Sequence, residues 1–138
     1  MATSSAVSRP DAGAADLSPR ARWRAFADAV RGLVHLFSGQ VHPWIHLTAT
    51  AAVAGLALWL GLPAGDWCWL VLAVGLVWVA EASNTALEEL ADALHPGAHP
   101  GVGRAKDAAA AAVLLAALAA ASIGLLVLGP PLWERLTS

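Results

Sequence analysis

The sequence predicts an all-α membrane protein, with an N-terminal amphipathic surface helix followed by three transmembrane helices. The first observation is composition: 58% of the 138 residues are apolar, and only 13% are Asp, Glu, Lys or Arg. A soluble domain has roughly a quarter charged residues, and a chain this short cannot bury so much apolar surface in a water-facing core. The second observation is the presence of long, nearly uncharged stretches at residues 45–62, 67–80 and 108–128. Since about 20 helical residues cross the hydrocarbon layer, we expect lipid to be the solvent of these segments.

The N-terminal segment, residues 1–18, is rich in Ser and Ala and lacks the apolar core of a signal peptide. We expect it to be disordered, because it offers little apolar surface to bury. Residues 19–138 are expected to form a single membrane domain.

A surface helix is predicted over residues 20–37. Two sets of residues fall on opposite sides of it: the apolar Trp23, Phe26, Val30, Leu33, Val34 and Phe37, and the polar Arg20, Arg24, Asp28, Arg31 and His35. Basic amphipathic helices of this kind lie in the headgroup layer of a membrane. A helix of a soluble bundle would show a similar pattern, and that alternative stays open.

The three spans are predicted at about residues 44–62, 67–94 and 105–128. Gly39 and Pro43 interrupt the chain before the first span, and Trp44 marks the membrane interface. The first and third spans are rich in Ala and Gly, and such small residues let helices approach closely in lipid. Cys68 is the single cysteine, and we assign it no function.

The basic residues predict the orientation, because Lys and Arg are retained on the cytoplasmic side. Of the eight basic residues, only Arg135 follows the third span, and the connection at residues 61–66 has none. We therefore expect the N-terminus inside, a tight outer turn at residues 62–65, a cytoplasmic loop at about 95–104, and the C-terminus outside. The net charge of −2 argues against nucleic acid as a partner.

The second predicted span carries a polar, mostly acidic face. At the helical period, Asn84, Thr85, Glu88 and Asp92 fall within about 60° of Glu81. A helix from residue 67 to 94 is about 42 Å long and extends beyond the bilayer core, so its cytoplasmic end must protrude. Leu87, Leu90 and Leu94 fall on the far side.

Glu81 lies about 21 Å along this helix from Trp67, inside the hydrocarbon near its cytoplasmic edge. An ionisable side chain at that depth costs on the order of 3 kcal/mol, and such residues are usually partnered and functional. We predict that Glu81 is a proton acceptor. For Glu89 and Asp92, a solvated helix end is an equally good interpretation.

The start of the third span is a candidate phosphate site. Helix N-termini favour anions, and Arg104 and Lys106 add positive charge there. Carboxylates that hold Mg²⁺ and cations that hold phosphate are what phosphoryl transfer requires. No Walker loop or kinase glycine loop is present. Lys106 and Asp107 taken alone would also serve as a charge pair that sets topology.

Two runs carry a resemblance to a known family. Residues 81–92, Glu-Ala-Ser-Asn-Thr-Ala-Leu-Glu-Glu-Leu-Ala-Asp, are followed by His99 and by residues 105–115, Ala-Lys-Asp-Ala-Ala-Ala-Ala-Ala-Val-Leu-Leu. These runs resemble the bacterial diacylglycerol kinase and undecaprenol kinase family. The resemblance covers about residues 22–128, including Phe26, Ala29 and Gly32 on the surface helix and Ile45-His46 at the first span.

The resemblance implies a homotrimer of three-span subunits in the bacterial cytoplasmic membrane, with active sites between neighbouring protomers at the cytoplasmic surface. The implied reaction is phosphorylation of a lipid hydroxyl by ATP with Mg²⁺, converting diacylglycerol to phosphatidate or undecaprenol to undecaprenyl phosphate. By position, the implied catalytic base is Glu81 and the implied metal ligand is Glu88. The implied nucleotide-binding residues are Asn84, Glu88, Asp92, Gly97, Ala98, His99, Lys106 and Asp107.

Gln40 is a departure from the family pattern, which usually has a second metal-binding glutamate there. An amide oxygen still ligates Mg²⁺ but brings no charge, so Gln40 is expected to contribute to metal and nucleotide binding more weakly. Residues 41–44 also depart from the common pattern, which leaves open a weakly active or repurposed member. Two other classes stay open: a small oligomeric ion or proton-coupled transport protein, because buried carboxylates also mark ion pathways, and a structural assembly subunit.

Overall fold

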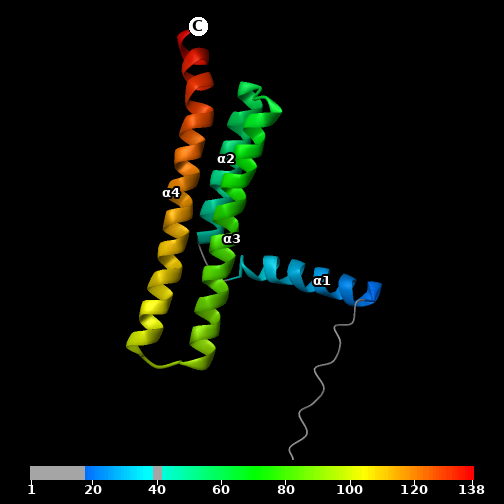
Figure 1. The fold of residues 1–138 in the computed structure, drawn as a ribbon, viewed down its shortest axis with the longest axis vertical. Helices are drawn as coiled ribbons and strands as arrows, with labels where there is room; N and C mark the ends of the chain where they lie inside the picture. The colour runs from blue at the N-terminus through cyan, green and yellow to red at the C-terminus, as the bar shows by residue number, and fades with distance from the viewer. Residues whose placement is uncertain (1–17, 39–41) are drawn as a thin grey trace, which may run out of the picture. The chain divides into compact units, whose positions relative to one another are not determined.

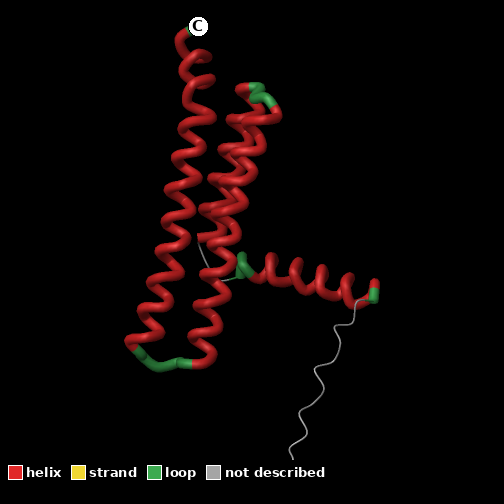
Figure 2. The backbone as a smooth tube through the Cα atoms, viewed as in Figure 1, coloured by secondary structure: helices red, strands yellow, loops and turns green. Residues whose placement is uncertain are grey.

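The computed structural model describes residues 18–38 and 42–138, and these residues are helical apart from short turns. The helices are α1 (Pro19–His35), α2 (His42–Leu60), α3 (Ala64–Leu94) and α4 (Pro100–Thr137), shown in Figures 1 and 2. The last three are long and apolar enough to cross a membrane. The predicted fold class is therefore confirmed. The segment predicted to be disordered, apart from Ser18, and Gln40 both lie outside the described residues.

The part of the chain up to Gly32 and the part from Leu33 onward form separate units and are described separately. The first unit contains most of α1, which begins at Pro19, where the fixed φ of proline suits the first helical position. The Ser18 hydroxyl accepts a hydrogen bond from the Ala21 amide at 3.2 Å and caps the helix. Trp23 stacks on Phe26 at 5.7 Å between ring centroids, and both are exposed. The predicted amphipathic helix is present, and it ends two residues before the expected boundary at 37.

The turn between α2 and α3 spans residues 61–63, so it lies slightly earlier than expected. Gly61 has a φ of +69°, which suits glycine because it has no Cβ. The Gly61 and Leu62 amides donate to the carbonyls of Leu58 and Ala57, the two bonds of a Schellman motif. This motif ends α2 at Leu60, two residues before the predicted boundary at 62, and α3 begins at Ala64, three residues before the predicted start.

The last helix, α4, is longer at both ends than the predicted residues 105–128. At its start, His99 is the N-cap and Pro100 takes the first position, so the helix begins before the basic residues. At its end, Pro130 and Pro131 lie inside the helix instead of stopping it. With 38 residues, α4 is about 57 Å long and exceeds the bilayer core.

The helices α2, α3 and α4 lie side by side around a small apolar core (Figure 1). Its buried centre is formed by Ala57, Leu70 and Leu128, one from each helix. Most large apolar side chains of these helices face outward, as expected where lipid is the solvent. Beyond the core, the Arg135 guanidinium lies over the Trp59 ring at 5.5 Å and joins the ends of α4 and α2.

Candidate active site

The polar face of α3 is turned into the protein. Glu81, Asn84 and Thr85 are buried, with exposed fractions of 1%, 6% and 5%. Leu87, Leu90 and Leu94, which the helical period placed on the far side, are exposed. Over this part of α3, polar side chains are therefore buried where Leu87, Leu90 and Leu94 are exposed, the reverse of what is usual on a water-soluble helix.

Three oxygen atoms on this face have no hydrogen-bond partner among the described residues: Glu81 Oε1, Asn84 Oδ1 and Thr85 Oγ1. An unsatisfied buried polar atom costs about 1–3 kcal/mol, and such atoms in a folded protein need an explanation. They lie within little more than one helical turn. We interpret the group as a place where a bound molecule supplies the missing partners.

The Glu81 carboxylate is approached on one side only. Its Oε2 lies 3.5 Å from Nε2 of His46 on α2, whereas Oε1 is unpartnered. One turn further along α3, the Asn84 amide donates a hydrogen bond to Glu88 Oε1 at 3.1 Å. Glu88 is half-buried. The amide thus fixes the orientation of the Glu88 carboxylate and leaves its own oxygen free.

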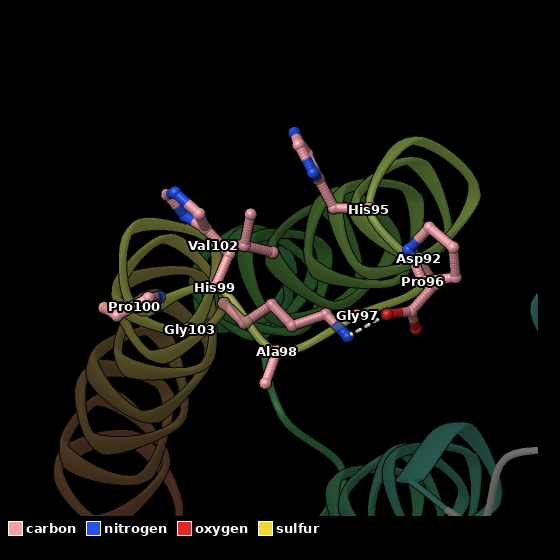
Figure 3. A pocket seen from close by; sticks show the side chains of 10 residues that line it. Asp92, His95, Pro96, Gly97, Ala98, His99, Pro100, Val102 and Gly103 are labelled. Atoms are coloured by element: carbon pink, nitrogen blue, oxygen red, sulfur yellow. Dashed lines mark hydrogen bonds and ion pairs between the residues drawn. The ribbon is translucent and has the colours of Figure 1, made fainter.

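Beyond Glu88, the end of α3 and the start of α4 enclose an open pocket of about 600 Å³ (Figure 3). The Lys106 ammonium crosses it and pairs with Asp92 Oδ1 at 2.5 Å. The predicted site residues that line this pocket are Asp92, Gly97, Ala98, His99 and Lys106. A positive charge beside a helix N-terminus suits a phosphate group.

His95 and His99 stack in this pocket with ring centroids 5.6 Å apart. His99 Nδ1 accepts a hydrogen bond from the Gly101 amide at 3.1 Å, so this nitrogen caps α4. Within residues 18–38 and 42–138, no three His, Cys, Asp or Glu side chains are grouped closely enough to share a metal ion. Neither ring is thus placed in a ready-made histidine metal centre.

The predicted site residues therefore fall into two neighbouring groups. Glu81, Asn84 and Glu88 follow one another along the buried face of α3, and the pocket begins at Asp92, about 16 Å from Glu81 along the axis. Asp107 is exposed and is not part of the pocket lining. Gln40, the remaining predicted residue, lies outside the described residues.

Contacts between helices add residues that sequence reasoning missed. His46 reaches Glu81 from α2, and His35 at the end of α1 bonds Glu89 Oε1 at 2.8 Å. The Trp78 indole donates to Thr50 at 3.2 Å. Polar residues inside the otherwise apolar first span were the available signal for His46 and Thr50.

The donor set fits Mg²⁺ better than a softer metal. Mg²⁺ prefers oxygen ligands and is usually held by one or two carboxylates together with substrate phosphates. Glu88 supplies a carboxylate next to the free Asn84 and Thr85 oxygens. Few protein ligands are needed when a nucleotide supplies the others.

Taken together, the fold and this site define a small multi-span membrane protein in which the helix that carries a buried carboxylate, Glu81, leads to an open pocket lined by Asp92 and Lys106. The profile of the prokaryotic diacylglycerol kinase family matches residues 27–128, and the chain belongs to this family.

Two relatives with similar sequences support this family assignment. The chain is 32% identical over 110 residues to a protein named undecaprenol kinase from Bacillus subtilis, covering 80% of this chain and 89% of that protein. It is 39% identical over 109 residues to one named diacylglycerol kinase from Synechocystis sp., covering 78% of this chain and 62% of that protein.

Proposed function

We propose that this protein is a lipid kinase that transfers the γ-phosphoryl group of ATP to the hydroxyl of a membrane lipid. The observation that carries the proposal is the buried Glu81 with its unpartnered Oε1. Glu81 is on the same helix as Glu88, and the pocket that contains Lys106 lies between the end of that helix and the start of α4. The names of the two relatives support a lipid alcohol as the acceptor, diacylglycerol or undecaprenol. Because both are named as kinases, the ion-transport and structural alternatives are not favoured.

In this proposal Glu81 acts as the general base. Its free Oε1 accepts the proton of the lipid hydroxyl as the hydroxyl oxygen forms a bond to the γ-phosphorus. The bond from that phosphorus to the β-γ bridging oxygen breaks, and ADP leaves. The arrangement along α3 suits the two substrates: Glu81 lies at membrane depth, where the lipid is, and the pocket lies beyond it.

The remaining residues position the nucleotide. Lys106, held by Asp92, supplies positive charge for the phosphates, and the turn at residues 97–99 lines the same pocket. Asn84 orients Glu88, which together with Gln40 would hold Mg²⁺. When bound, Mg²⁺ neutralises the phosphate charge that develops during transfer.

We further propose that the chain works as a homotrimer in the bacterial cytoplasmic membrane, as the family resemblance implies. The exposed apolar faces of α2, α3 and α4 give ample surface for helix contacts between copies. Chemical cross-linking in detergent and in native membranes, followed by mass measurement, would detect three copies in one complex.

The function is tested by phosphate transfer from γ-labelled ATP, with the purified full-length protein in mixed micelles that contain Mg²⁺. Diacylglycerol and undecaprenol are assayed in parallel. Glu81→Gln keeps the side-chain shape but accepts no proton, so we expect its rate to fall by about 10²–10⁴-fold. Glu134→Gln, an exposed change near the end of α4, is the control. Near wild-type transfer by Glu81→Gln would reject Glu81 as the base.

A further inference from the structure

His46 faces the proposed base from the neighbouring helix. Its side chain is 18% exposed, and its Nε2 approaches Glu81 Oε2 at 3.5 Å, whereas the Glu81 side chain is 2% exposed. A buried carboxylate needs a partner to offset the loss of water. His46 approaches Oε2 and not Oε1, so the two oxygens of Glu81 are not equivalent, and Oε1 has no hydrogen-bond partner among the described residues.

The His46 ring packs against Trp78 of α3, which is in turn bonded to Thr50 of α2. The Trp78 ring lies edge-on to it, with centroids 6.3 Å apart and an interplanar angle of 67°. The Thr50 hydroxyl donates its proton to the His46 carbonyl at 2.7 Å and therefore can only accept from the Trp78 indole N–H, which lies 3.2 Å away. Phe37 also packs against Trp78, with the two ring centroids 5.7 Å apart.

A histidine is not needed here for packing alone. His46 lies at one end of an apolar groove of about 540 Å³ between α2, α3 and α4, lined mainly by Ala, Val and Leu side chains. An aliphatic side chain would fill that position without the desolvation cost of an imidazole. The polar contact that the imidazole makes in this region is the one to Glu81.

We propose that His46 is a positioning residue for Glu81. Its ring holds Oε2 and thereby presents Oε1 to the lipid hydroxyl, while Trp78, which is bonded to Thr50, packs against the ring. The inference rests on the proposed function, because it gives Glu81 the role of base. It adds His46, a residue of α2, to the site residues that the sequence predicted.

The kinetic test compares His46→Leu with His46→Gln in the micelle assay. Leucine fills the space but offers no polar atom, so we expect kcat to fall about 100-fold, as for a misplaced catalytic group. The KM values for lipid and ATP should stay within about threefold, because His46 is not expected to touch either substrate. Glutamine keeps an N–H donor and should recover about tenfold of the lost kcat. A purely structural role would give the opposite ranking, with leucine better tolerated.

The supporting pair is tested with Trp78→Phe, Thr50→Val and the double variant. Both single variants break the same hydrogen bond, so we expect each to lower kcat by about three- to tenfold. The double variant should have a kcat no lower than that of the less active single variant. Leu47→Ala, next to His46 in sequence but exposed, is the control and should keep wild-type kcat.

A readout independent of activity comes from ¹⁵N-histidine NMR of the full-length protein in micelles, with the His46 signals assigned through His46→Gln. Glu81→Gln should shift the His46 Nε2 resonance, and an unchanged resonance would overturn the contact whatever the protein phosphorylates. Wild-type kcat in His46→Leu, or no recovery of kcat in His46→Gln, would overturn the positioning role of His46. If Glu81→Gln is inactive at the same time, the proposed function still stands. An active Glu81→Gln would remove the base assignment and the positioning role together.

Discussion

Glu88 and Glu89 are adjacent in sequence but have different surroundings, because one residue turns a helix by about 100°. Glu88 accepts the Asn84 amide on the side of α3 that carries Glu81. Glu89 bonds His35 instead and is about half exposed. The pair therefore offers a matched test of which carboxylate would hold the proposed Mg²⁺.

We expect Glu88→Gln to raise the Mg²⁺ concentration for half-maximal activity about tenfold or more, because it removes the charge that attracts the ion. Glu89→Gln removes the same charge one residue away and should change that concentration less than about twofold. The measurement is the rate of phosphate transfer as a function of Mg²⁺ at fixed ATP. An equal shift in both variants would show that general surface charge, and not ligation by Glu88, sets the requirement.

Lys106 lines the pocket, and in the proposed function it binds a phosphate of the nucleotide. It is two-thirds buried and pairs with Asp92, so its ammonium is already oriented. We expect Lys106→Ala to weaken binding of Mg·ATP by about tenfold or more, since a charge-assisted hydrogen bond contributes about 1.5–3 kcal/mol. Isothermal titration with a non-hydrolysable ATP analogue measures it.

Arg135→Ala is the matched control for Lys106→Ala. It removes the same charge from the other end of α4, where Arg135 contacts Trp59. Nucleotide affinity should be unchanged in this variant. Comparable losses in both would mean that net charge, and not the pocket, attracts the nucleotide.

At the level of residues, sequence predicted which side chains of α3 share a face but not what they contact. The period of one helix is enough to place Glu81, Asn84 and Glu88 together. The pairing of Lys106 with Asp92 joins positions 14 apart, and that of His35 with Glu89 joins positions 54 apart. Such contacts depend on how helices pack, which no local pattern specifies.

At the level of elements, the number and type of helices followed from the sequence, and their ends did not. The third span was expected to end at about residue 128, yet α4 continues through Pro130 and Pro131 to Thr137. Proline is tolerated in membrane helices because neighbouring groups and local adjustment satisfy the freed carbonyls. The start of α4 was also missed, because His99 and Pro100 look like a turn until the histidine is seen to cap the helix.

The close approach of the three spans depends on a small residue at their meeting point. Ala57 is fully buried against Leu70 and Leu128. Ala57→Leu inserts additional carbon atoms into this core, so we expect a loss of about 1–3 kcal/mol in the free energy of unfolding. Unfolding by added SDS in mixed micelles measures the change.

Ala52→Leu makes the same substitution on an exposed part of α2 and serves as the control. It should change the free energy of unfolding by less than about 0.5 kcal/mol. If Ala57→Leu also left the free energy of unfolding unchanged, the three helices would not pack as closely as described for the core.

For the whole molecule, the distribution of charge connects topology to function. The candidate pocket lies between α3 and α4, and the basic residues that precede α2 belong to the same side of the membrane if the chain crosses it three times. The positive-inside rule predicts that this side is cytoplasmic. The pocket would then face the compartment that holds ATP.

Cysteine labelling tests this orientation. In a Cys68→Ser background, which removes the single native thiol, His95→Cys marks the turn beside the pocket and Ser138→Cys marks the C-terminus. Both positions are exposed. A membrane-impermeant maleimide added to intact bacterial spheroplasts should label Ser138→Cys at once and His95→Cys only after permeabilisation. The reversed pattern would place the Lys106 pocket outside, away from cytoplasmic ATP, and would contradict the proposed lipid kinase as well as the predicted topology.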